Sequence, residues 1–538
     1  MRPLWYRDAV IYQIDPSLFR DSDGDGCGDL RGIAERLDHV RGVGATCVWL
    51  LPFYASPFRD GGYDVSDHMA VDPRFGDVGD FVEVLERADD LGLGVMLDLV
   101  VQHTSDQHRW FQEARRDRKS PYRDYYIWAD EPEPSEVWQV FPTVEDGVWT
   151  WDEEAQQFYR HTFYSHEPDL SLDRPQVREE VRRIMAYWLR LGIAGFRVDA
   201  VPFMVERGRA ARPGQSGHWL LREMSDLVDL RSSNGTLLGE VDEAPERYAD
   251  YFAHGMTMLL DFWVNNHFFL ALARKDARPL REALRSQSPP PPHGRYVQWL
   301  RNHDELDLER LTPDERAEVF ATFAPEPGMR AYERGIRRRL APMFGGDRRL
   351  LALAHALLLS LPGTPILRYG DEIGMGDDLD LPERQSVRTP MQWTAGDTGG
   401  FSEAPLDRFV VRPVPDEAYG PKAVNVEDQS LDQGSLLVEV SRLVRTRIAL
   451  HEIGSGTCEV LDVGPDGVFA ACHEGSGPPV VTLVNLGERE ATVDLAQHGL
   501  SGLVDVLSDR NYPHPGDGSV SLDGYGYRWL RARRRHGR

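Results

Sequence analysis

The sequence predicts a closed barrel of eight parallel strands surrounded by helices, followed by a smaller antiparallel domain. Eight short apolar runs alternate with helical stretches up to about Ser435, which is the pattern of a parallel α/β sheet. Three of these runs end in a carboxylate, and parallel barrels carry their chemistry at the C-terminal ends of the strands. The later part of the chain changes to alternating runs separated by Gly and Asp turns, which is typical of an antiparallel sandwich.

The strands of the barrel are expected where apolar residues are continuous, because a parallel strand is buried on both faces. In chain order these runs are Ala9–Ile14, Ala45–Leu51, Gly94–Val101, Ile193–Val198, Thr236–Gly239, Met256–Phe262, Tyr296–Leu300 and Thr364–Leu367. Helices are expected between them, for example at Asp80–Leu91 and Val177–Leu191. The longest apolar stretch, Leu350–Leu361, is shorter than the roughly 18 residues of a membrane span and indicates a buried helix.

Two intervals are longer than a single crossover helix requires. The first, 103–168, is rich in aromatic residues and is expected to form a small inserted domain over the mouth of the barrel. The second, 312–346, follows the seventh strand and is charged and helical in pattern. The barrel therefore takes 1–102 and 169–435, and 436–538 forms the C-terminal β-sandwich. Its strands are expected at Val460–Val463, Val480–Val484, Ala491–Leu495, Leu503–Leu507 and Tyr527–Leu530.

Composition excludes several partners. The net charge of −26 argues against nucleic acid and anionic membranes and favours a neutral ligand. Four cysteines are too few for a disulfide framework, and no signal-like segment opens the chain. We therefore expect a cytoplasmic protein without membrane association. A homo-oligomer is left open, because symmetric interfaces can be locally apolar.

The three strand-end carboxylates are Asp199, Glu240 and Asp304. Arg197 lies two positions before Asp199, on the same face of a strand, where its charge would keep the carboxylate ionised as a nucleophile. Glu240 follows Leu237 and Leu238, so its pKa is expected to be raised. One strand-end acid alone is commonly a helix cap or a surface charge, but the three together with Arg197 and His303 favour a shared site.

Four motifs then occur in order: Asp98–His103, Gly195–Asp199, Gly239–Glu240 and Asn302–Asp304. With them the chain resembles the α-amylase clan of retaining glycosidases, glycoside hydrolase family 13. The resemblance implies that Asp199 is the nucleophile, Glu240 the general acid/base and Asp304 the stabiliser of the transition state. A retaining mechanism needs two such carboxyl groups about 5–5.5 Å apart.

The same resemblance implies residues that bind the glucosyl unit. His103 and His303 would bond its hydroxyls, and Arg197 and Tyr63 belong to the same pocket. In exo-acting members the positions of Asp64 and Arg388 form a pair that binds the non-reducing end. If they pair here, the pocket is blind and accepts one glucosyl unit at a time.

An acidic turn near the N-terminus indicates a structural calcium ion, and no organic cofactor is expected. Carboxylates alternate with small residues from Asp21 to Asp29, although the EF-hand glutamate is replaced by Gly32. The turn matches that of the oligo-1,6-glucosidase-like branch, whose ligands would be Asp21, Asp23, Asp25, Asp29 and the Cys27 carbonyl. A solvated acidic turn is the alternative. A second calcium site near Asp169 and Glu206 is left open, because Gln102 stands where the family usually has asparagine.

Within the clan, four segments resemble trehalose synthases, which interconvert maltose and trehalose: Asn302–Leu306, Gly335–Pro342, Gly370–Asp377 and Ala423–Glu427. In that branch 312–346 helps to close the pocket, so that released glucose turns and attacks before water does. Val241–Pro245 departs from the usual Ala-Asn-Gln-Trp-Pro. The expected ligand is therefore a small neutral α-glucoside such as maltose or trehalose. An α-glucosidase of short oligosaccharides and, more remotely, a non-catalytic sugar-binding relative are the alternatives.

Overall fold

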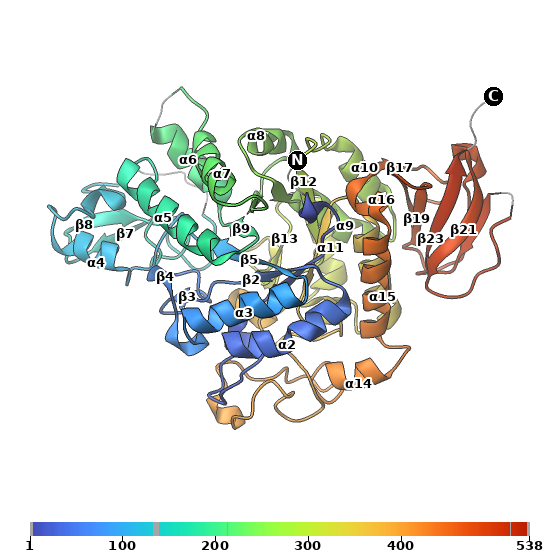
Figure 1. Ribbon diagram of the computed structural model, residues 1–538, viewed down its shortest axis with the longest axis horizontal. Helices are drawn as coiled ribbons and strands as arrows, with labels where there is room; N and C mark the ends of the chain where they lie inside the picture. Colours follow the sequence, from blue (N-terminus) through green and yellow to red (C-terminus); the bar gives the residue numbers. More distant parts are fainter. Residues whose placement is uncertain (1–3, 133–138, 212–213, 517, 535–538) are drawn as a thin grey trace.

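A computed structural model describes the chain except residues 1–3, 133–138, 212–213, 517 and 535–538 (Figure 1). Its centre is a closed barrel of eight parallel strands in the order β1-β16-β12-β11-β10-β9-β5-β2. The strands are β1 (Ile11–Ile14), β2 (Cys47–Leu50), β5 (Gly94–Leu99), β9 (Gly195–Val198), β10 (Thr236–Gly239), β11 (Met258–Leu260), β12 (Arg295–Trp299) and β16 (Thr364–Arg368). All eight lie at the expected runs, so the barrel prediction is confirmed.

The register of the barrel brings the motif residues together. Asp98 of β5 pairs with Arg197 of β9, and Val198 of β9 pairs with Gly239 of β10. Residues that directly follow these strands, Asp199 and Glu240, therefore leave the barrel at the same rim. Below them the interior is filled by a cluster of buried side chains, which includes Trp49, Met96 and Leu238. The barrel is thus a packed core with a polar rim.

Helices cover the outside of the barrel (Figure 1). They include α2 (Leu30–Val43), α3 (Val78–Asp90), α5 (Pro175–Leu191), α7 (Trp219–Arg231), α9 (Phe262–Arg274), α10 (Arg278–Ser286) and α13 (Arg348–Ser360). Asp29 caps α2 by accepting from the Gly32 amide at 2.7 Å, and Asp77 and Asp80 form a capping box on α3. The apolar helix expected at Leu350–Leu361 is α13. No helix among the described residues has the length and apolar character needed to cross a membrane.

The interval 103–168 contains α4 (Arg109–Arg116) and a small antiparallel sheet. Its strands are β6 (Trp128–Ala129), β7 (Trp149–Asp152) and β8 (Gln157–Arg160), in the order β6-β8-β7. The group lies at one side of the barrel in Figure 1. Positions 133–138 of this interval lie outside the described residues.

The segment 312–346 is helical only in part. It begins with α11 (Pro313–Phe323), capped by Thr312, and ends with the short α12 (Leu340–Met343). Between them, β14 (Arg330–Ala331) and β15 (Gly335–Ile336) form a small sheet with β13 (Leu306–Asp307). Pro325 and Pro327 interrupt the helical pattern, because proline removes a backbone donor and cannot continue a helix.

The C-terminal region starts with α15 (Leu436–Ala449) and continues as two packed antiparallel sheets. The larger sheet has the order β17-β18-β19-β23-β21, and β20 pairs with β22. The bounds are β17 (Thr457–Val460), β18 (Val468–Glu474), β19 (Val480–Asn485), β20 (Ala491–Asp494), β21 (Leu500–Ser508), β22 (Ser519–Leu522) and β23 (Tyr527–Arg534). The antiparallel domain is confirmed. The prediction of a strand at Val460–Val463 is wrong beyond Val460, because β17 ends at that residue. β18 escaped prediction because it is buried on both faces and shows no alternation.

Candidate active site

The three predicted carboxylates meet at one rim of the barrel. Asp199 follows β9, Glu240 follows β10 and Asp304 lies five residues after the end of β12. Glu240 and Asp304 also line a common cavity of about 490 Å³. The rim therefore brings together residues that are up to 105 positions apart in the chain.

One guanidinium joins the first two carboxylates. Arg197, which is 1% exposed, lies 2.5 Å from Asp199 Oδ1 through Nη1 and 2.7 Å from Glu240 Oε1 through Nη2. Nη1 also donates to Asp98 Oδ1 at 2.7 Å. Two carboxylates on the two terminal nitrogens of one guanidinium are compatible with the separation of about 5–5.5 Å that a retaining mechanism uses.

Burial, rather than the arginine, sets the direction of both pKa values. It raises the pKa of Glu240 to about 7, against the lowering effect of Arg197. It also raises the pKa of Asp199; Arg197 lowers this pKa, as expected, but does not offset the burial. The reason is that Arg197 is shared with Asp98, whose own pKa burial raises to about 6. A single cation divided among three acids cannot fully offset their desolvation.

The backbone after β9 is strained at one residue. Ala200 has a φ of 52°, in the left-handed region that residues with a Cβ rarely adopt. This turn directs the Ala200 amide to Glu240 Oε2, to which it donates at 3.0 Å. The strained turn therefore orients both acids, since it follows Asp199 directly and bonds Glu240.

Asp304 is held ionised by its neighbours. His303 Nε2 lies 3.0 Å from Oδ2, and Arg384 and Arg388 lie 2.9 and 3.1 Å from Oδ1. Burial opposes ionisation, but these three contacts lower the pKa of Asp304 well below its usual value. Burial lowers the pKa of His303 to about 3. Gln13 Nε2 lies 3.2 Å from His303 Nδ1, so a neutral His303 accepts there and donates from Nε2 to Asp304.

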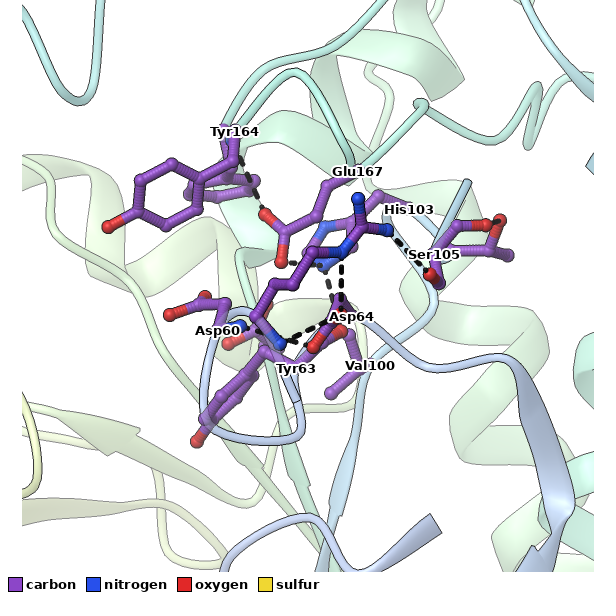
Figure 2. Close-up of polar contacts among 12 residues, drawn as sticks. Asp60, Tyr63, Asp64, Val100, His103, Ser105, Tyr164 and Glu167 are labelled. Carbon is purple, nitrogen blue, oxygen red and sulfur yellow. Dashed lines mark hydrogen bonds and ion pairs between the residues drawn. The ribbon is translucent and has the colours of Figure 1, made fainter. Parts of the chain in front are cut away.

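Tyr63 and His103 lie beside this cluster. The Tyr63 ring stacks on His303 with centroids 5.3 Å apart, and the Arg197 guanidinium lies 5.8 Å from its centroid. His103 Nε2 donates to the Tyr63 carbonyl at 3.2 Å, and burial lowers the pKa of His103 (Figure 2). The Tyr63 hydroxyl and His103 Nδ1 are buried without a hydrogen-bond partner. Such atoms are what a polyhydroxylated ligand would satisfy.

Asp64 and Arg388 do not form the expected pair. Arg388 donates to the His303 carbonyl at 3.0 Å and to Asp304 at 3.1 Å. Asp64 accepts from the Ser56 hydroxyl at 2.9 Å and from the amides of Arg59 and Asp60 at 3.2 Å (Figure 2). The physical reason is that Asp304 is the nearer anion for Arg388, while Asp64 is already satisfied by its own turn.

Sequence reasoning missed Arg384. Its guanidinium bonds Asp60 at 2.8 and 2.9 Å and Asp304 at 2.9 Å, and it lies 5.1 Å from the centroid of Phe141. It thus connects the turn before Asp64 with the third carboxylate. Its position four residues before Arg388 was the one available signal, and spacing alone does not distinguish it from a surface arginine.

The cavity beyond Glu240 and Asp304 is strongly charged. Eight acidic and four arginine side chains line it, together with Val140, Phe141, Phe163 and Phe203. Asp242 lies 2.9 Å from Arg310, and Asp307 lies 2.7 Å from Arg334. Val241–Pro245 differs from the Ala-Asn-Gln-Trp-Pro that is usual in trehalose synthases. Its Asp242 therefore has an ion-pair partner, Arg310, in the loop after β13.

The acidic turn can hold a metal ion. Asp21, Asp23 and Asp29 each offer a carboxylate oxygen within 4.8 Å of the others. Asp25 accepts from the Cys27 amide at 2.7 Å, which closes the turn. Oxygen ligands at this spacing suit a hard cation such as calcium.

At the position of the second calcium site, arginines occupy the surroundings of Asp169. Arg160 and Arg207 lie 3.3 and 3.8 Å from its Oδ2. Gln102 is buried, and its amide oxygen and nitrogen have no hydrogen-bond partner. Two guanidiniums there supply the positive charge that an ion would otherwise provide.

Comparisons with known proteins agree with this geometry. The model of the alpha amylase catalytic domain matches residues 13–305 and 337–456, and the model of the sucrose hydrolase-like C-terminal domain matches 477–531. Trehalose synthase/amylase TreS of Mycolicibacterium smegmatis is 39% identical over 98% of this chain and 93% of its own length. A probable alpha-glucosidase of Rhizobium meliloti is 32% identical over 93% and 92%.

Solved structures share the fold. The alpha-amylase from H. orenii matches with a TM-score of 0.79 and 25% identity, covering 97% of this chain and 99% of that one. The trehalulose synthase MutB from Pseudomonas mesoacidophila MX-45 matches with a TM-score of 0.77 and 24% identity, covering 98% and 99%. Because the family model matches more than half of the residues, in a barrel whose rim carries the four motifs, the chain belongs to the α-amylase family.

Proposed function

We propose that the protein is a retaining α-glucoside enzyme whose leading reaction is the interconversion of maltose and trehalose. The observation that carries the proposal is the buried Arg197 guanidinium, which holds Asp199 and Glu240 beside each other at the barrel rim. The relatives named trehalose synthase, with 38–40% identity, support the choice of reaction.

In the first step Asp199 attacks the anomeric carbon of a terminal glucosyl unit, and the bond to the leaving oxygen breaks. Glu240, whose raised pKa of about 7 leaves a large fraction of it protonated near neutral pH, gives its proton to that oxygen. A covalent glucosyl ester of Asp199 and a free glucose result. Glu240 then removes a proton from the incoming hydroxyl, which attacks the ester carbon and releases Asp199.

Asp304 would bind sugar hydroxyls as an anion through both steps. Its charge is stabilised by Arg384 and Arg388. A fixed negative group beside the reacting carbon favours the positive charge that develops on the ring in the transition state. Tyr63, His103 and His303 would enclose the same glucosyl unit.

Closure of the site is supported by contacts among three segments. The hydroxyls of Tyr164, from the inserted interval, and Tyr332, from 312–346, both donate to Glu383, at 2.7 and 2.6 Å. Phe141 stacks on Tyr164 with centroids 4.5 Å apart. Phe141 also lines the cavity that Glu240 and Asp304 line, so these contacts would keep released glucose in place and water out. This supports 103–168 and 312–346 as the units that close the barrel domain.

The calcium ion would have a structural role. Asp21, Asp23 and Asp29 would hold it, and Asp29 also caps α2. The ion would therefore fix the turn that precedes a barrel helix, with no part in the chemistry. Cys27, Cys47 and Cys458 are free cysteines, which supports a reducing, cytoplasmic location.

A second candidate is an α-glucosidase that transfers the glucosyl unit to water. The charged cavity favours it, because Asp242, Glu243 and Ala244 stand there in place of the branch's two amides and tryptophan. Polar side chains in place of a tryptophan favour water in the cavity, and water is the competing acceptor.

The two candidates are separated by the products formed from maltose. The purified protein is incubated with maltose, and trehalose and glucose are resolved by chromatography, with Glu240→Gln as the blank. Trehalose in excess over glucose supports the synthase. Glucose alone assigns the protein as a glucosidase, and the absence of any product from maltose refutes both.

A further inference from the structure

One buried cation behind the third carboxylate has no place in the reaction described so far. Arg301 lies two residues after the end of β12 and is 1% exposed. Its hydrogen bonds within the described part of the chain all go to main-chain carbonyl oxygens. Nη2 donates to the Asp304 carbonyl at 2.8 Å and to the Ile336 carbonyl at 3.4 Å, and Nε donates to the Arg338 carbonyl at 2.9 Å. One side chain thus connects the loop that carries Asp304 with the segment 312–346.

The loop of Asp304 is held by three buried guanidinium groups in succession. The carbonyl oxygens of the consecutive residues 302–304 accept, in that order, from Arg368 at 2.7 Å, from Arg388 at 3.0 Å and from Arg301 at 2.8 Å. Arg368 ends β16, and Arg388 lies in the loop that follows it. Arg301 is the member of this group that also bonds the segment 312–346. Any movement of that segment is therefore passed through Arg301 to the backbone of Asp304.

The guanidinium group suits such a bridge. It is planar and carries several N–H donors in a fixed geometry, so it can hold carbonyl oxygens of two segments at a set distance. Burial lowers the pKa of Arg301 to about 10, against the charges of Asp371, Glu305 and Asp304, so the group is still a cation at neutral pH. A buried cation binds carbonyl dipoles more strongly than a neutral donor does. The bridge therefore fixes the backbone from which the Asp304 carboxylate projects.

The segment that Arg301 bonds also borders the acceptor cavity. Arg334 lines this cavity and donates from Nη1 to the Val140 carbonyl, in the inserted interval, at 2.9 Å. The segment has further anchors, because β15 pairs with β13 and Arg338 Nε lies 2.9 Å from Asp377. It should therefore stay folded when Arg301 is changed, while its link to the Asp304 carbonyl is lost.

We propose that Arg301 is a positioning residue that couples the segment 312–346 to Asp304, so that closure of the acceptor cavity and alignment of the third carboxylate depend on one another. This inference rests on the proposed function, in which Asp304 stabilises the transition state. Arg301 makes no contact with the sugar in this role and acts through the main chain of Asp304.

The test compares two buried arginines at different places in the fold. Arg447 on α15 is also buried, and burial likewise lowers its pKa to about 10. It donates to the carbonyls of Leu359, Leu361 and Gly363, which precede β16 at the end of the barrel opposite the carboxylate rim. Arg447→Gln is therefore the matched control for Arg301→Gln, because each change removes one buried guanidinium from three carbonyl oxygens.

Steady-state kinetics and product analysis should separate the two variants, with all rates normalised to the folded fraction. Arg301→Gln should lower kcat for an aryl α-glucoside by about tenfold and keep KM within about threefold, because the alignment lost is needed mainly in the transition state. The ratio of trehalose to glucose formed from maltose should fall by about fivefold, because the closing segment is less firmly held. Arg447→Gln should leave both quantities within about twofold of the parent, with a comparable fall in Tm.

The conservative variant separates charge from geometry. Arg301→Lys keeps the positive charge but presents it at a single nitrogen, which cannot span both segments as the planar group does. We expect it to lose kcat by at least about threefold. Full activity in Arg301→Lys would show that charge alone is needed and would overturn the inference.

Other outcomes also overturn the inference. Equal losses of kcat in Arg301→Gln and Arg447→Gln would give Arg301 only a general role in stability. An unchanged product ratio in Arg301→Gln would show that the segment 312–346 is not coupled to Asp304. If Arg301→Gln does not fold, the kinetics and product ratio of Arg301→Lys decide. A parent that forms glucose and no trehalose would refute the synthase reaction alone, because the kinetics on the aryl α-glucoside would still test Arg301.

Discussion

The glucosyl-binding end and the acceptor cavity, which meet at Glu240 and Asp304, are built in different ways. The first consists of residues at or near barrel strand ends, such as Arg197 and His303, which are 1% exposed and packed on the core. The second consists of loops and the inserted segments, where Asp242 and Arg310 are partly exposed and paired with each other. We therefore expect the barrel to provide bond cleavage and the loops to decide which acceptor receives the glucosyl unit.

Removal of the nucleophile should have the largest effect and should act equally on every substrate. Asp199→Ala is expected to lower kcat for maltose and for an aryl α-glucoside by at least about 10⁴-fold, because no covalent ester can form. Steady-state kinetics measure the loss, and thermal unfolding checks that the protein is folded. Trehalose formation that survived the change would place the chemistry outside the rim.

Glu240 should give the alkaline limb of the pH profile. Its pKa is raised to about 7, so the acid form is present below that value and is lost as the pH rises through it. Glu240→Gln should reduce kcat/KM by about 10²–10⁴-fold and remove this limb. The profile is measured with an aryl α-glucoside. An unchanged limb in the variant would contradict the assignment of Glu240 as the acid.

Arg384 lies between the two regions, so its loss should affect both of them. Arg384→Ala removes one cation from Asp304 and opens the contact with Phe141. We expect the ratio of trehalose to glucose formed from maltose to fall by about tenfold, because water gains access to the glucosyl ester. Arg412→Ala, which breaks ion pairs with Asp378 and Asp380 elsewhere, is the matched control. An equal fall in both variants would indicate a general loss of stability.

A change confined to the acceptor cavity should alter product choice more than cleavage. Asp242→Asn removes one of the two carboxylates that pair with Arg310 and leaves Glu309 at 3.1 Å, and the product ratio should change by about threefold or more. Release of the aryl group should change less, since the glucosyl end is untouched. Arg310→Gln and the double variant complete a double-mutant cycle. Independent effects of the two changes would show that the pair does not act as a unit.

The calcium turn should affect stability and hardly affect rate. Added Ca²⁺ should raise Tm by on the order of 3 °C in the parent, because it binds the folded chain alone. Asp21→Asn should abolish this increase and leave kcat within about twofold. Asp25→Asn is a comparison within the same turn, since its carboxylate bonds the Cys27 amide and lies outside the group of Asp21, Asp23 and Asp29. An equal loss of the Ca²⁺-dependent increase in Tm in both variants would show that Asp25 is also a ligand.

Much of the barrel was predictable from the sequence because its strands are buried on both faces and therefore appear as continuous apolar runs. The same property concealed β18, whose Phe469 packs in the core shared with the barrel while Ala470 packs in the sandwich core. The helix at 350–361 was predictable from its length and composition. The small sheet of β13, β14 and β15 was not, because two-residue strands carry no periodicity.

The sequence by itself determined which chemistry is available: three carboxylates, an arginine beside one of them, and motifs in the order of a known family. These are local features, and spacing along a strand is enough to detect them. Only the tertiary structure decided how the charges are shared. Arg197 reaches Glu240 as well as Asp199, Arg388 pairs with Asp304 in place of Asp64, and Arg384 enters the site from a distant loop. The reason is that ion pairing and desolvation depend on distances and burial in space, which sequence separation does not encode.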